Sequence, residues 1–170
     1  MKNKTPVPVL LTKTIVILSV AALAFVPLPA HARKQVPFKA VFATEFDSTV
    51  AFPIASVHVV GDGPVTHLGL TQIETTDQEV NLVTGSATAT YQLVAANGDE
   101  IMLFTEVFLP ATIPPNLTFL GAWTISGGTG QFAGASGSGT TEGSVTFTGP
   151  DVGVGHFTMT GTISSPGSLK

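Results

Sequence analysis

Apolar and polar residues alternate along most of the chain beyond residue 35, and no 3.6-residue periodicity is sustained over a comparable length. The segment 83–93 is the clearest example, because apolar residues or glycine occupy every second position and Thr, Ser and Gln fill the positions between. The segments 117–125, 144–148 and 156–163 repeat the pattern. Threonine and β-branched residues suit the half-buried surface of a sheet, so the pattern predicts an all-β chain.

Turn residues divide these runs into about eight strands. The Asn-Gly pair within 97–99 indicates a tight hairpin, and the segments 61–64 and 114–116 are rich in Gly or Pro and are expected to be turns. The strands are expected near 36–46, 54–60, 65–75, 82–95, 100–109, 117–126, 136–148 and 153–164. Short connections predict one eight-stranded antiparallel β-barrel over residues 33–170, in which closure removes the exposed edges. A β-sandwich would show the same alternation.

The first 32 residues have the features of a signal peptide. Three early lysines precede the apolar run 15–26, and Ala30-His31-Ala32 supplies the small residues at a cleavage site. A run of about 12 residues is shorter than the roughly 20 that a membrane-spanning helix needs. We therefore expect cleavage after Ala32, giving a secreted or periplasmic protein that does not span the membrane; an uncleaved anchor is the alternative.

Charge and cysteine usage exclude several classes of function. The chain has 7 Lys and Arg against 11 Asp and Glu, and no cation lies between Lys39 and Lys170. A domain without cations cannot neutralise phosphates, so we expect no nucleic-acid partner. With no cysteine, the chain has neither a disulfide nor a thiolate metal site. The histidines also lack the spacing of a zinc site, and we expect no metal and no cofactor.

The glycine-rich segment 126–140 reads as a wide turn between two strands. It lacks the Lys-Ser/Thr of a phosphate-binding loop and precedes no predicted helix. Glycine allows positive φ and close backbone approach, and the one phenylalanine would then point into the core. The residues assigned to this structural turn are Gly127, Gly128, Gly130, Phe132, Gly134 and Gly137.

The segment 127–137, GGTGQFAGASG, resembles the GGTG-x-F-x-GA-x-G signature of allene oxide cyclases, dirigent proteins and uncharacterised bacterial exported relatives. The resemblance implies an eight-stranded, calycin-like antiparallel barrel that is often trimeric. The activities do not carry over with it. Allene oxide cyclases have a cysteine near the cavity and dirigent proteins have an arginine, whereas this chain has no cysteine and no arginine after Arg33.

Four residues are candidates for lining a ligand pocket inside the barrel. Tyr91, Phe119 and Trp123 lie on the apolar faces of their predicted strands, and His67 lies near the start of another. Ligand cavities are mostly apolar with a few polar groups. The alternative is that the aromatic residues only fill the core and that His67 makes a structural hydrogen bond.

Glu106 is the only candidate for acid–base catalysis. It shares a strand face with Met102, Phe104 and Phe108, and a carboxyl group among apolar side chains favours its neutral form. However, both faces of 100–109 are apolar, so this face is either the interior or the outside. An apolar outer face would favour a homo-oligomer, either a dimer or a trimer.

These observations favour an exported barrel that binds a small hydrophobic ligand or serves as a structural module. The alternatives are a cofactor-free isomerase or cyclase acting on a hydrophobic substrate and, third, a surface adhesion component. The interior distinguishes them, because a cavity of about 300 Å3 or more indicates ligand binding. A carboxylate inside it would favour the enzyme, and a solidly packed barrel would leave the structural role.

Overall fold

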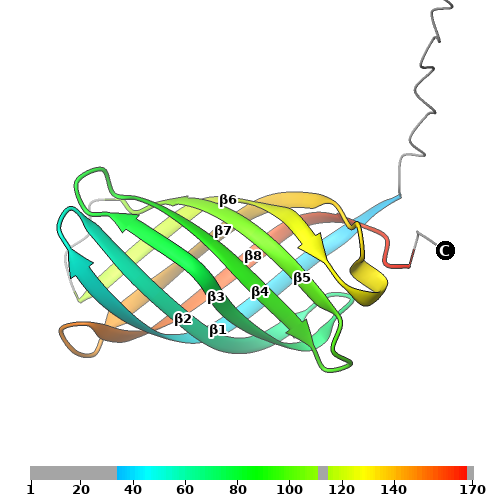
Figure 1. Cartoon of the computed structure of the whole chain (residues 1–170), viewed down its shortest axis with the longest axis horizontal. Helices are drawn as coiled ribbons and strands as arrows, with labels where there is room; N and C mark the ends of the chain where they lie inside the picture. The colour runs from blue at the N-terminus through cyan, green and yellow to red at the C-terminus, as the bar shows by residue number, and fades with distance from the viewer. Residues whose placement is uncertain (1–33, 111–114, 168–170) are drawn as a thin grey trace, which may run out of the picture. The chain divides into compact units, whose positions relative to one another are not determined.

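The computed structural model describes residues 34–110 and 115–167, which form a closed β-barrel (Figure 1). Its elements are β1 (Gln35–Ala51), β2 (Ile54–Val65), β3 (Gly69–Asn81), β4 (Ser86–Ala95), β5 (Glu100–Phe108), β6 (Asn116–Gly128), the 3-10 helix η1 (Gly130–Phe132), β7 (Gly137–Phe147) and β8 (Val152–Ser164). The predicted signal peptide lies outside the described residues. Within them, no helix has the length and apolar character needed to cross a membrane.

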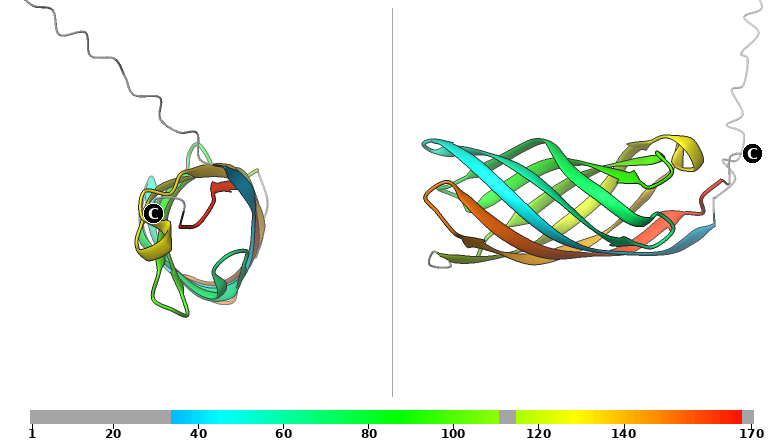
Figure 2. Two further views of the ribbon diagram at one scale, coloured as in Figure 1. Left: turned by 90° about the vertical axis from the view of Figure 1, so that its right-hand side faces the viewer. Right: turned by 90° about the horizontal axis from the view of Figure 1, so that it is seen from below.

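Each strand pairs antiparallel with the next one in sequence, and β8 returns to pair with β1. The closing register runs from Gln35 opposite Ser164 to Asp47 opposite Val152. Figure 2 shows the resulting ring of tilted strands from one end and from the side. The pairing confirms the predicted eight-stranded antiparallel barrel and excludes the sandwich.

The predicted turn at 61–64 is wrong, because this segment lies within β2. A Cβ atom on Gly63 would clash with the carbonyl oxygen of Val41 on β1. Glycine is therefore required there by close strand approach. The chain instead turns at 66–68, where His67 adopts a positive φ of 69°.

Because consecutive strands are antiparallel, their connections alternate between the two ends of the barrel. We call the half nearest the connections 66–68, 96–99 and 129–136 the packed half, since most of the core lies there. We call the half nearest the turns 52–53, 82–85 and 148–151 the hollow half. The fully or nearly fully buried core of the packed half includes Phe38, Leu93, Ile101, Leu103, Trp123, Phe132 and Ile163.

Candidate functional site: an apolar cavity in the hollow half

The hollow half of the barrel encloses a cavity of about 560 Å3. Inward-facing positions of all eight strands form its wall. Its apolar lining includes Phe46, Val59, Ala87, Ala89, Val107, Leu117, Val145 and Phe147. Phe157 and Met159 line the cavity and also belong to the core of the packed half, so they form its floor.

Pairs of phenylalanine and glycine on neighbouring strands help to keep the cavity empty. Phe46 on β1 is paired in register with Gly153 on β8, and a Cβ on that glycine would lie 2.5 Å from the Phe46 ring. Phe119 on β6 is likewise paired with Gly143 on β7, at 2.7 Å. Each ring therefore packs against the wall in the space that the glycine leaves. The aromatic groups line the cavity without filling it.

The polar groups of the cavity wall are uncharged. The Tyr91 hydroxyl donates to Gln78 Oε1 at 3.3 Å, and the Thr105 hydroxyl is 3.4 Å from the carbonyl oxygen of Ala89, to which it donates. Burial raises the pKa of the Tyr91 phenol, which is therefore neutral at ordinary pH. Among the described residues that line the cavity, none is Asp, Glu, Lys, Arg or His. This site can hold a neutral molecule but offers no counter-charge to an ion.

Two of the four pocket candidates lie at the cavity and two do not. Tyr91 and Phe119 line it. Trp123 lies in the packed half, where its ring is 5.0 Å from that of Phe38 and its Nε1 donates to the carbonyl of Thr140 at 3.1 Å. His67 lies on the β2–β3 turn, where its Nε2 is 3.0 Å from the carbonyl oxygen of Pro37. Alternation predicts that Tyr91 and Trp123 both point inward, but it does not reveal where along the barrel axis each side chain lies.

The interpretation of Glu106 as an interior acid or base is not supported by its position. Glu106 is exposed on the outer face of β5, together with Phe104 and Phe108, and cannot reach the cavity. The inward positions of β5 are Ile101, Leu103, Thr105 and Val107. Sequence reasoning could not choose between the faces, since both are largely apolar. The apolar outer face agrees with an oligomer, but the predicted dimer or trimer stays a prediction.

The glycine-rich segment connects β6 to β7 at the packed end of the barrel. Phe132 within it is 0% exposed and belongs to the core, and Gly130 and Gly134 have positive φ. The Asp99 carboxylate accepts a hydrogen bond from the backbone N–H of Gln131 at 3.3 Å, and Thr129 Oγ1 accepts one from the N–H of Glu100 at 3.0 Å. These contacts hold the segment against the β4–β5 hairpin, far along the barrel from the cavity mouth.

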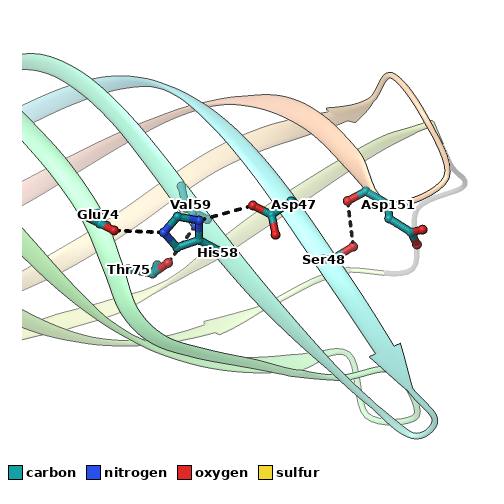
Figure 3. Close-up of polar contacts among 7 residues, drawn as sticks. All are labelled: Asp47, Ser48, His58, Val59, Glu74, Thr75 and Asp151. Carbon is teal, nitrogen blue, oxygen red and sulfur yellow. Dashed lines mark hydrogen bonds and ion pairs between the residues drawn. The ribbon is translucent and has the colours of Figure 1, made fainter.

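The sequence did not predict a polar cluster that the structure places on the outer wall of the barrel. Figure 3 shows His58 of β2 between Asp47 of β1 and Glu74 of β3. Its Nε2 is 3.1 Å from Glu74 Oε1, and its Nδ1 is 3.3 Å from Asp47 Oδ1. The hydrogen bonds with Glu74 and then Asp47 raise the pKa of His58, and the His58 ring links three adjacent strands through these two contacts. The three residues are far apart in sequence, and only the strand register brings them together.

No group of three or more His, Cys, Asp or Glu in the described part of the chain is arranged to hold a metal ion. The Asp47–His58–Glu74 cluster places its carboxylates on opposite sides of the imidazole ring, and it is solvent-exposed. It is therefore a surface ion-pair network across strands.

The comparison with protein-family models finds no match, and neither does the comparison with curated proteins. Among solved structures, the chain is similar to that of the pterocarpan synthase dirigent protein, with 10% sequence identity and a TM-score of 0.48. The match covers 87% of this chain and 99% of that one. The eight-stranded fold is established by the strand pairing of this chain itself.

Proposed function

We propose that this protein binds a small, uncharged apolar molecule in the cavity of its hollow half. The observation that carries the proposal is the 560 Å3 cavity with an apolar wall. Ligand sites are typically about 300–1,000 Å3 and are lined by apolar and aromatic side chains with a few polar groups. A barrel serving only as a structural module would gain stability by filling this space.

Binding is favoured over the alternative, a cofactor-free isomerase or cyclase. The acid–base candidate Glu106 lies on the outside, and the Tyr91 phenol, which does line the cavity, holds its proton more tightly than an ordinary tyrosine does. Neither group supplies a proton acceptor to the interior near neutral pH. From the pattern of residues 1–32 alone, we also propose that the protein is secreted or periplasmic.

The test is a titration with the neutral fluorescent probe N-phenyl-1-naphthylamine. We expect saturable fluorescence enhancement with the wild-type protein. Ala89→Phe places a ring in the cavity, because Ala89 is 5% exposed and lines it. We expect this variant to bind at least about tenfold more weakly, because filling the space removes the site.

The matched control is Ala43→Phe, which adds the same ring to an exposed position on the outer face of β1. This variant should bind the probe as the wild type does. Absence of saturable binding to the wild type, or equal binding to Ala89→Phe, would overturn the proposed function. Circular dichroism should show that both variants keep the barrel.

A further inference from the structure

We infer that Thr141 is the polar anchor of the cavity, and that the ligand is a neutral apolar molecule carrying one oxygen that hydrogen-bonds to the Thr141 hydroxyl. An alcohol, ketone or ether oxygen on a largely hydrocarbon body meets this description. The inference rests on the proposed function, which it deepens by naming the class of ligand.

The Thr141 hydroxyl is buried without a partner. Thr141 is 3% exposed and lines the cavity, and its Oγ1 makes no hydrogen bond. Among the buried side-chain polar atoms that the structure describes, it is the one in this state. A buried hydroxyl without a partner destabilises the ligand-free protein by about 1–3 kcal/mol. A ligand that supplies the missing hydrogen bond would remove this cost, so the site is suited to a ligand with a polar atom.

The two cross-strand partners of Thr141 cannot supply that bond with their side chains. Across the two adjoining strands, Thr141 is paired in register with Gly121 of β6 and Met159 of β8. Neither side chain carries a nitrogen or oxygen atom. Rotation about the threonine χ1 between staggered rotamers can bring the hydroxyl to the position that the methyl group occupied, without moving the backbone. The hydroxyl can therefore turn toward a ligand in the cavity that Thr141 lines.

Two other hydroxyl groups of the wall are already engaged. The Tyr91 hydroxyl donates to Gln78, and the Thr105 hydroxyl donates to the carbonyl of Ala89. No cation lines the cavity among the described residues, so a carboxylate or phosphate would be buried there without compensation. Together these contacts favour a neutral ligand with one polar atom directed at Thr141.

The test compares two probes that differ only in a hydroxyl, 2-naphthol and naphthalene. Thr141→Val keeps the shape of the side chain and removes the hydroxyl. We expect its affinity for 2-naphthol to fall about three- to tenfold, the value of one hydrogen bond, and its affinity for naphthalene to stay within about twofold of the wild type. Isothermal titration calorimetry with both probes measures the ratio.

Two further variants control for packing. Thr71→Val also removes a buried hydroxyl, but Thr71 does not line the cavity and its hydroxyl donates to the carbonyl of Gly69, so the preference for 2-naphthol should be unchanged. Thr141→Ser keeps the hydroxyl and should keep the preference for 2-naphthol over naphthalene. This variant also tests the anchor if Thr141→Val folds poorly.

The outcomes separate this inference from the function beneath it. If Thr141→Val binds 2-naphthol as tightly as the wild type does, or loses both probes equally, the anchor is overturned while binding of naphthalene to the wild type still supports the proposed function. If water rather than the ligand satisfied the Thr141 hydroxyl in the complex, Thr141→Val would not lower the affinity for 2-naphthol selectively, and the anchor would again be overturned. If neither probe binds the wild type saturably, both conclusions fail.

Discussion

The packed and hollow halves of this barrel are continuous along the same eight strands and follow the same alternation of inward and outward residues, yet one half is solid and the other holds a cavity. The difference lies in the inward side chains. The large side chains of Leu93 and Trp123 belong to the buried core of the packed half, whereas alanines at 87 and 89 line the cavity on β4 in the hollow half. Alternation therefore specifies a barrel, and residue size specifies where it is hollow.

The largest expected contrast between the halves concerns two phenylalanines in connecting segments. Phe132 is 0% exposed in the β6–β7 connection, and Phe52 is 77% exposed in the β1–β2 turn. We expect Phe132→Ala to lower the free energy of unfolding by about 3–5 kcal/mol and Phe52→Ala to change it by less than about 0.5 kcal/mol. Urea denaturation measures both. Similar losses in the two variants would mean that the hollow end is as tightly packed as the other.

Two leucines test the same contrast within the strands. Leu93 on β4 is fully buried in the core, while Leu117 on β6 is only half-buried and lines the cavity. Leu93→Ala should destabilise the fold by about 2–5 kcal/mol, because it creates a new void. Leu117→Ala enlarges an existing one and should cost less than about 2 kcal/mol. Equal values from chemical denaturation would contradict the assignment of the two halves.

Two buried threonines give a smaller effect of opposite sign. In the packed half, Thr71 is 1% exposed and its hydroxyl donates to the carbonyl of Gly69 at 3.2 Å, whereas the Thr141 hydroxyl has no partner. Thr71→Val should cost about 1 kcal/mol of unfolding free energy through the lost bond. Thr141→Val should leave the ligand-free protein unchanged or more stable by up to about 1 kcal/mol. A loss of stability in Thr141→Val would show that its hydroxyl is satisfied without ligand.

The smallest expected effect is the pH dependence from His58 on the outer wall. Because Glu74 and Asp47 raise its pKa in the folded protein, its contribution is fully present below about pH 6.5 and is lost as the pH rises through the folded value. For so exposed a group we expect less than about 1 kcal/mol. Urea midpoints near pH 5.5 and pH 9 should differ more in the wild type than in His58→Gln. The exposed His156→Gln variant should behave as the wild type does.

The strands and their closure were predictable because burial in this barrel repeats every second residue. A turn at 61–64 was predicted wrongly because glycine occurs at turns and also within strands that approach a neighbouring strand closely, and the sequence alone does not distinguish the two. Glu106 could not be oriented, because both faces of β5 are apolar and only the register with its neighbours decides which is inside. The missing bond of Thr141 depends on which side chains β6 and β8 place beside it, and no local pattern encodes that.

The pairing of β1 with β8 has a consequence for how the chain acquires its fold. Thirteen register pairs join segments from opposite ends of the sequence, 35–47 and 152–164. Until the last of these residues is available, β1 and β7 each present an unpaired edge to the surroundings. A chain that ends before β8 therefore has two adhesive edges, and such fragments should self-associate through intermolecular strand pairing. Only a chain that contains both β1 and β8 can pair both edges.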